Sequence, residues 1–259
     1  MMNILVTNDD GIDAKGINVI FNKLKEYGHS VYMVAPAGNR SAVSSKISMF
    51  SSLEMKCTAE NKWSCEGSPA DCVIIACKSE IFPEKIDMVV SGINAGANLG
   101  TDVVYSGTCA AARQAALYKI PGVAVSLDKD YYSQWDDFLY EPLAEFVCKN
   151  IEKLHSILVS CKNEGFININ GCNQKSYKGA VLCKELSLRD YNDKIKVVPV
   201  SVDSSGKGLY SSEFVSSDLK STEEIDSDFH AVKNGFISVS LIKAEPASLI
   251  VEKNYDFVL

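Results

Sequence analysis

Short apolar runs alternate with segments of helical spacing along this chain, and this alternation restricts the fold more than any other feature. Residues 3–7 (NILVT) and 30–36 (SVYMVAP) are rich in β-branched and apolar residues and are typical of buried strands. Between them, residues 16–27 place apolar side chains at helical spacing, and Gly28 suits the end of a helix. A strand, a helix and a second strand predict a β-α-β unit, the start of a doubly wound parallel sheet.

The same alternation continues to about residue 155. Ser68 and Pro69 are typical of the first positions of a helix, so the segment GSPADCVIIACKSEI is predicted to be helical. Further strands are expected at 86–91 and 122–127, and further helices at 108–118 and 138–150. The sequence therefore predicts an α/β core over residues 1–155.

The remainder of the chain, residues 156–259, has a different character. Its apolar runs are short and strand-like (FINING, GAVLCKEL, KIKVVPV and GFISVSLI), and Ser- and Asp-rich stretches lie between them. We expect this β-rich part to complete the core or to extend from it. The polar stretch 203–228 is predicted to be a mobile or partner-facing loop.

Charge and cysteine content limit the classes of partner. The 259 residues carry a formal net charge of −7, so the chain lacks the basic balance that a nucleic-acid polymer requires. A small anionic substrate needs local positive charge, from a metal ion or from backbone N–H groups.

Nine scattered cysteines without a CxxC motif indicate reduced thiols. With no signal-peptide pattern and no long apolar stretch, we expect a cytoplasmic protein without membrane contact.

Three polar loops follow predicted strands and should meet at the carboxyl edge of the sheet, where open α/β sheets bind ligands. Asp9 and Asp10 lie in the first loop, Ser41 in the second and Asn94 in the third. Two adjacent carboxylates repel each other, and a divalent cation removes that cost. Their oxygens, with those of a hydroxyl and an amide, suit Mg²⁺, Mn²⁺ or Ca²⁺. Alone, each of these residues is more often a turn residue or a helix cap than a metal ligand.

A second candidate site lies at the start of the predicted Ala-rich helix. Free N–H groups and the helix dipole make such an N-terminus an anion site, and Gly107 allows a ligand to come close to the backbone. The hydroxyls of Ser106 and Thr108 could add hydrogen bonds, although simple N-capping explains the same residues. Arg40 is expected either to contact phosphate or to lie on the surface. The three histidines do not cluster in sequence, and none is given a catalytic role.

Taken together, these loops resemble the SurE family. That family is marked by NDDG after the first strand, by NRS after the second, and by SGIN-x-G-x-N-x-G followed by YSGT. In this chain the motifs occupy residues 8–11, 39–41, 91–100 and 105–108. Their order and spacing match over roughly the first 130 residues, and the combination is far more specific than any single motif.

The resemblance implies a Rossmann-like three-layer α/β/α sandwich whose more β-rich C-terminal extension holds a β-hairpin and oligomerisation segments. It implies one divalent metal ion per subunit, with Asp9, Asp10, Ser41 and Asn94 as ligands. It further implies that Asn98, Ser106, Gly107 and Thr108 hold the substrate phosphate. The implied activity is hydrolysis of nucleoside 5'- and 3'-monophosphates, with short polyphosphate as a further substrate, in a homodimer or homotetramer.

Metal-assisted attack of water on the phosphoester is the predicted reaction, in which Asp9 or Asp10 could also accept the proton of the water. A phosphatase with an aspartyl-phosphate intermediate requires a DxD motif after the first strand, and a dinucleotide-dependent oxidoreductase requires GxGxxG in the first turn. This chain has neither motif at those places. A non-catalytic nucleotide sensor on the same fold remains an alternative. We expect the base contacts to come from the second half of the chain.

Overall fold

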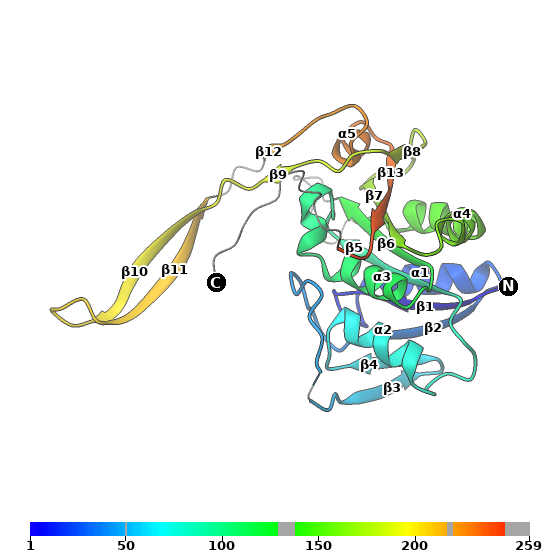
Figure 1. The fold of residues 1–259 in the computed structure, drawn as a ribbon, viewed down its shortest axis with the longest axis horizontal. Helices are drawn as coiled ribbons and strands as arrows, with labels where there is room; N and C mark the ends of the chain where they lie inside the picture. The colour runs from blue at the N-terminus through cyan, green and yellow to red at the C-terminus, as the bar shows by residue number, and fades with distance from the viewer. Residues whose placement is uncertain (50, 129–137, 217–219, 247–259) are drawn as a thin grey trace, which may run out of the picture.

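A nine-stranded sheet with helices on both faces forms the body of the chain (Figure 1). The computed structural model describes residues 1–49, 51–128, 138–216 and 220–246. The strands of the sheet are Asn3–Thr7 (β1), Ser30–Pro36 (β2), Met55–Ala59 (β3), Lys62–Cys65 (β4), Met88–Ala95 (β5), Gly122–Asp128 (β6), Gly165–Cys172 (β7), Ala180–Cys183 (β8) and Ile237–Lys243 (β13). Their order across the sheet is β3-β4-β2-β1-β5-β6-β7-β13-β8.

Strand β1 lies at the centre of a parallel block. It pairs in parallel with β2 on one side and with β5 on the other, and β4, β6 and β7 continue the parallel pairing outward. Ile4 and Val6 join the core on one face of the sheet, whereas Leu5 joins the core on the other. Both faces of β1 are therefore buried, which explains why its sequence is apolar without alternation. The predicted parallel start of the sheet is confirmed.

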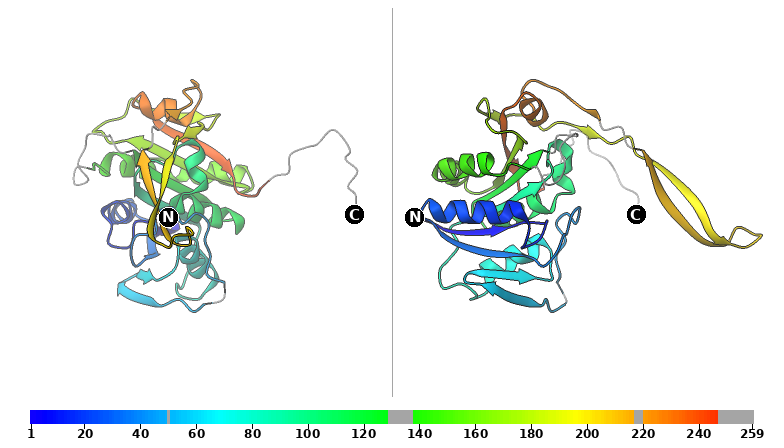
Figure 2. Two further views of the ribbon diagram at one scale, coloured as in Figure 1. Left: turned by 90° about the vertical axis from the view of Figure 1, so that its left-hand side faces the viewer. Right: turned by 180° about the vertical axis from the view of Figure 1, so that it is seen from behind.

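Two helices cover each face of the sheet, which gives the three layers expected from the sequence. Helices α1 (Lys15–Glu26) and α4 (Glu141–Ser160) lie on one face, and α2 (Pro69–Lys78) and α3 (Gly107–Leu117) lie on the other, as the left-hand view of Figure 2 shows. Small residues in α3, among them Ala111 and Ala112, are fully buried and let this helix pack closely on β5 and β6. The α/β sandwich is confirmed.

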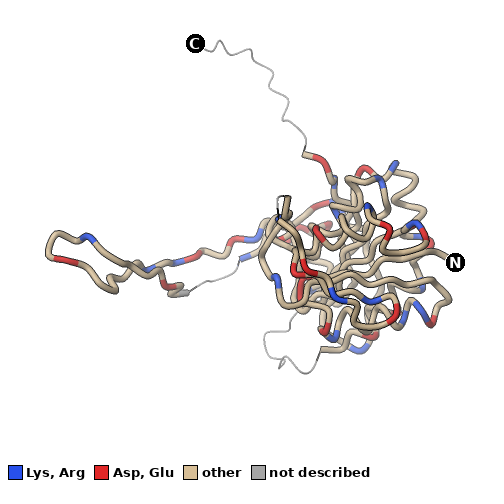
Figure 3. The backbone as a smooth tube through the Cα atoms, turned by 90° about the horizontal axis from the view of Figure 1, so that it is seen from below, with Lys and Arg blue, Asp and Glu red and all other residues tan. Residues whose placement is uncertain are grey.

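Strands from beyond residue 155 complete the sheet. β7 pairs with β6, and β13 then pairs antiparallel with β7 and in parallel with β8. A short helix, α5 (Asp228–Lys233), packs on β13. A two-stranded hairpin of β10 (Lys194–Val202) and β11 (Gly208–Ser216) projects away from the body, and Figures 1 and 3 show this from two directions.

Part of the stretch 203–228 differs from its predicted loop structure. Residues 208–216 form β11, because their backbone groups pair with β10 from Val202 back to Lys194. Farther along, Lys220–Ser221 (β12) pairs with Arg189–Asp190 (β9), and α5 begins at Asp228. Residues 217–219 lie outside the described residues, as do residues 247–259 of the predicted oligomerisation segments.

Two other predicted elements have shifted boundaries, and one further strand is present. The strand expected at 86–91 continues to Ala95, because it keeps pairing with β6 beyond an irregularity after Ser91. The helix expected at 138–150 begins at Glu141 and runs to Ser160, since Leu154 and Leu158 prolong its buried stripe. Residues 55–59 form β3, which is not among the predicted strands and begins the antiparallel pair with β4.

The helices and cysteines of the described residues bear on what the composition predicts for membrane spans and disulfide bonds. Within the described ranges, no helix has both the length and the apolar character needed to cross a bilayer. All nine cysteines lie in described residues, and none of them forms a disulfide bond there. Five of them, Cys65, Cys72, Cys109, Cys148 and Cys183, are buried. Their burial accords with the predicted reduced thiols, which behave as small apolar side chains.

Candidate active site

A cleft of about 600 Å³ opens at the carboxyl edge of the sheet, where the loops after β1, β2 and β5 meet. Of the predicted site residues, those on its wall are Asp9, Asp10, Ser41, Asn94, Asn98 and Ser106. The other lining residues are Asn39, Ala42, Ala95, Ala97, Asp102, Tyr105, Tyr191, Asp193 and Phe214. The structure therefore brings together side chains from three distant loops, as expected for an open parallel sheet.

The turn after β1 is held in shape by Asn8. This fully buried side chain donates from Nδ2 to the carbonyl oxygen of Gly11 at 2.8 Å and accepts from the N–H of Gly11 at 3.2 Å. Gly11 has φ +106°, a conformation that favours glycine, and a Cβ atom there would lie 3.2 Å from the backbone of Gly38. The turn is thus fixed at both ends, with Asp9 and Asp10 between them.

Asp9 is buried against the first turn of α3. The Thr108 hydroxyl donates to Asp9 Oδ1, and a Cβ atom on Gly107 would lie only 2.9 Å from the Cβ of Asp9. Burial raises the pKa of Asp9 to about 6, the Thr108 hydrogen bond opposes this rise, and the charge of Asp10 adds to it. A carboxylate in this place is stabilised by a nearby positive charge.

Asp10 and Asn94 come together across the edge of the sheet. Asp10 Oδ2 accepts from the backbone N–H of Ala95 at 3.0 Å, and burial raises the pKa of Asp10 as well. Asn94 donates from Nδ2 to the carbonyl oxygen of Gly96 at 2.8 Å. Because this bond engages the amide nitrogen, the amide oxygen of Asn94 is free to act as a ligand.

The second loop is tied to the first through its backbone. The N–H of Arg40 donates to the carbonyl oxygen of Asp9 at 2.6 Å, and the N–H of Ser41 donates to Asn39 Oδ1 at 2.9 Å. The exposed Ser41 side chain lies on the wall of the cleft with the two aspartates. These bonds bring a neutral hydroxyl oxygen to the acidic pair.

Asn98 is held by two asparagines that sequence reasoning missed. Asn170 Oδ1 accepts from the N–H of Asn98 at 2.8 Å, and Asn168 Nδ2 donates to the carbonyl oxygen of Asn98 at 2.7 Å. The Asn98 amide also donates to Ser126 Oγ at 2.7 Å. Asn168 and Asn170 are fully buried in β7, and their alternation with apolar residues in FINING was the available signal.

The first residues of α3 and its N-cap have two different surroundings: Ser106 lies on the cleft wall, whereas Gly107 and Thr108 lie against Asp9. Ser106 is the N-cap of α3, and its Oγ accepts from the N–H of Cys109 at 3.0 Å, which leaves the hydroxyl hydrogen to be donated into the cleft. Thr108 is fully buried and is not among the residues that line the cleft, and its expected contact with phosphate stays a prediction. Its hydroxyl is engaged by Asp9 instead, and Gly107 provides the space for that carboxylate.

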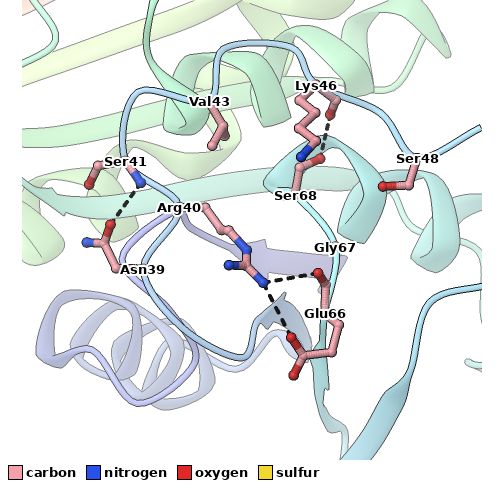
Figure 4. A pocket seen from close by; sticks show the side chains of 9 residues that line it. All are labelled: Asn39, Arg40, Ser41, Val43, Lys46, Ser48, Glu66, Gly67 and Ser68. Carbon is pink, nitrogen blue, oxygen red and sulfur yellow. Dashed lines mark hydrogen bonds and ion pairs between the residues drawn. The ribbon is translucent and has the colours of Figure 1, made fainter. Parts of the chain in front are cut away.

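The cleft carries negative charge. Asp9, Asp10, Asp102 and Asp193 line it, and none of its described lining residues is a lysine, an arginine or a histidine. Arg40 turns instead into an adjoining cavity of about 410 Å³, where its Nη2 lies 3.3 Å from Glu66 Oε2 (Figure 4). Of the two positions expected for Arg40, the partly exposed one outside the main cleft is therefore observed.

The donor set of the cleft fits a hard divalent cation. The buried carboxyl of Asp9 and the partly buried carboxyl of Asp10, both with raised pKa values, line the cleft with a hydroxyl and an amide oxygen. The described wall supplies no cationic side chain of its own. Within the described ranges, no three His, Cys, Asp or Glu side chains form a metal-binding group, so the fit depends on the two neutral donors. One bound cation would offset the cost of burying the acidic pair.

Asp102 forms a buried ion pair beside the cleft. Its Oδ2 lies 3.0 Å from Nε of Arg189, and the two side chains are 11% and 9% exposed.

We expect Asp102→Ala to lower the free energy of unfolding by about 3 kcal/mol, because it leaves the guanidinium buried and without its carboxylate. Urea denaturation measures this. Glu223→Ala, which removes an exposed ion pair with Lys233, is the control and should change stability by less than about 1 kcal/mol. Equal effects of the two substitutions would contradict the expectation.

The chain is similar to known proteins in sequence and in fold. The family model described as Survival protein SurE matches residues 4–192. The 5'-nucleotidase SurE of Mannheimia succiniciproducens is 36% identical over 247 residues, which cover 95% of this chain and 94% of the relative. The 5'-nucleotidase SurE of Histophilus somni is 37% identical over 244 residues, with 94% and 93% covered.

A solved structure supports the same assignment at the level of the fold. The crystal structure of the SurE protein from Aquifex aeolicus superimposes with a TM-score of 0.74 at 27% identity, covering 95% of this chain and 94% of that one. The family match extends over the loops that carry Asp9, Asp10, Ser41, Asn94 and Asn98. From the sequence match and the shared fold together, the chain belongs to the SurE family.

Proposed function

We propose that this chain is a metal-dependent phosphomonoesterase that hydrolyses nucleoside 5'-monophosphates to nucleoside and phosphate. One observation carries the proposal: the buried Asp9, the partly buried Asp10, a hydroxyl and an amide oxygen line one cleft whose described wall has no cationic side chain. The relatives named 5'-nucleotidase SurE support the choice of substrate.

Each subunit is proposed to bind one divalent ion, which is Mg²⁺, Mn²⁺ or Ca²⁺. Its proposed ligands are Asp9, Asp10, Ser41 and Asn94. When bound, such an ion supplies Lewis acidity toward a phosphoryl oxygen and makes water a stronger nucleophile at neutral pH. The Thr108 hydroxyl keeps the Asp9 carboxylate in place, and the Ala95 N–H does the same for Asp10. These bonds fix the two acids before the substrate arrives, so little reorganisation accompanies the reaction.

Asn98 and Ser106 are the proposed donors to the phosphate. One N–H of the Asn98 amide is used by Ser126, and the other is available to a ligand in the cleft. Ser106 can donate its hydroxyl hydrogen while it caps α3. Asp9 or Asp10 is the proposed acceptor of a proton from attacking water; Asp10 Oδ2 accepts from the Ala95 N–H, and Oδ1 is its other carboxylate oxygen. Together these groups bind the phosphate and remove the proton that the reaction releases.

The proposal extends to 3'-monophosphates and short polyphosphate as further substrates. A 3'-monophosphate presents the same terminal phosphate to the same donors. The cavity that contains Arg40 also contains Lys46, and it shares Asn39 and Ser41 with the main cleft (Figure 4). A second phosphate of a polyphosphate chain would find positive charge there.

A homodimer or homotetramer is also proposed. The hairpin of β10 and β11 exposes Val197, Leu209 and Val215, each more than half exposed in the single chain. A two-stranded ribbon with apolar side chains exposed along its length is typical of a contact with another protein surface. The hairpin is therefore the proposed contact between subunits.

Phosphate release from a panel of substrates tests the proposed function. With Mg²⁺ or Mn²⁺ present, we expect AMP and GMP to be hydrolysed with kcat/KM of at least about 10⁴ M⁻¹ s⁻¹. The panel should include 3'-AMP and tripolyphosphate, to test the wider substrate range. Tight binding of nucleotide without phosphate release would identify a sensor instead of an enzyme, and would contradict the proposal.

A further inference from the structure

Part of the cleft wall is aromatic and comes from outside the motif loops. Tyr191 and Phe214 line the cleft together with Asp9 and Asp10, and they come from the second half of the chain. We propose that Tyr191, assisted by Phe214, forms the binding site for the nucleobase of the substrate. This inference rests on the proposed nucleotidase function and assigns a role to residues that the motifs do not include.

Tyr191 is fixed by the buried ion pair beside the cleft. Its hydroxyl donates to Asp102 Oδ1 at 2.8 Å, while Arg189 Nε donates to Asp102 Oδ2 at 3.0 Å. Arg189 also donates from Nη1 to Ser221 Oγ at 3.2 Å. Since Asp102 and Arg189 are almost completely buried, the tyrosine hydroxyl has a rigid anchor and the ring has little freedom to move.

The segment that carries Tyr191 is docked on the turn that leads into α3. This turn is the 3₁₀ helix η1 (Gly100–Val104). The N–H of Thr101 donates to the carbonyl oxygen of Ser187 at 3.1 Å, and the N–H of Arg189 donates to Thr101 Oγ1 at 3.1 Å. A Cβ atom on Gly100 would lie 1.9 Å from the same Ser187 oxygen, so only glycine allows this contact. The ring is thereby held at a set position relative to Ser106, which follows η1.

The chemistry of this wall favours a flat, uncharged group. Tyr191 and Phe214 offer aromatic faces, whereas the nearby carboxylate of Asp193 repels a second phosphate. Aromatic side chains stack on every base, because each base has a π-face. The cleft volume of about 600 Å³ lies within the range of small-ligand sites. A nucleobase attached to a phosphate at Asn98 and Ser106 therefore fits this wall in charge and in shape.

Removal of the ring tests the inference by comparing two substrates. AMP carries a base, and ribose 5-phosphate carries the same sugar and phosphate without one. We expect Tyr191→Ala to raise KM for AMP about tenfold, to leave kcat within about twofold, and to leave kcat/KM for ribose 5-phosphate unchanged. Tyr191→Phe keeps the ring and should show a smaller change in KM for AMP.

Two further variants make the result decisive. Tyr27→Ala removes a tyrosine whose hydroxyl also bonds a carboxylate, Glu145 Oε1 at 2.6 Å, at the end of α1, and should change neither substrate. Phe214→Ala should raise KM for AMP alone. Equal losses on both substrates, or an unchanged KM for AMP in both Tyr191→Ala and Phe214→Ala, would overturn the base site. If the unmodified chain hydrolyses neither substrate, the proposed function fails instead.

Discussion

Asp9→Asn is expected to lower kcat/KM for AMP about a thousandfold, which corresponds to about 4 kcal/mol of transition-state stabilisation. The amide has almost the shape of the carboxylate and can still accept the Thr108 hydrogen bond. It lacks the negative charge that a divalent cation requires, so the loss reports on charge and not on shape. Steady-state phosphate release at saturating Mg²⁺ measures it.

Two controls show whether the loss of kcat/KM in Asp9→Asn comes from the site and not from unfolding of the chain. They are the stability of Asp9→Asn itself and the activity of a matched variant. Burial raises the pKa of Asp9 to about 6, so the side chain is ionised in the metal-free fold at pH 7.5. Because the fold favours the protonated form, this ionisation lowers the free energy of unfolding. Metal-free Asp9→Asn should therefore be at least as stable as the unmodified chain at pH 7.5. Asp13→Asn changes an exposed aspartate that does not line the cleft, and should keep full activity. Asp9→Asn activity within tenfold of the unmodified chain would contradict the proposed role.

Removal of divalent metal is expected to reduce phosphate release to below about 1% of the starting rate, because the described cleft wall has no cationic side chain to replace the ion. Addition of Mn²⁺ or Mg²⁺ should restore the rate. It should also raise Tm, since a cation that binds only the folded chain stabilises it. Activity assays and thermal denaturation, with and without chelator, measure both effects.

Asp9→Asn serves as the control for the thermal effect. Its Tm should rise much less on addition of Mn²⁺, because one of the two carboxylates of the proposed ligand set is gone. Full activity in a chelated sample that contains no metal by elemental analysis would show that the reaction does not need the ion.

Local sequence patterns predicted most of the core and much of the site. The apolar runs at β1 and β2 can only be buried strands, and polar loops after parallel strands meet at one edge of a sheet. Ser106 was recognisable as a residue at the start of a helix, because it precedes an Ala-rich segment. The convergence of Asp9 with Ser41 and Asn94 on one cleft follows from this topology.

What the sequence could not predict depends on contacts between distant segments. The Thr108 side chain faces Asp9 and not the cleft, which depends on how α3 packs against the turn after β1. Tyr191 reaches the cleft through Asp102, a residue 89 positions earlier in the chain. The strand at 208–216 was not predicted, because its polar residues remove the apolar pattern that indicates a strand. Such residues are tolerated there since the hairpin projects from the body and does not need a buried face.

Anomalous X-ray diffraction from crystals grown with Mn²⁺ would show where a divalent cation binds. We expect one strong anomalous peak per chain, about 2.1 to 2.4 Å from side-chain oxygens of Asp9, Asp10, Ser41 and Asn94. A peak at another place, or no peak at a Mn²⁺ concentration that supports full activity, would contradict this expectation.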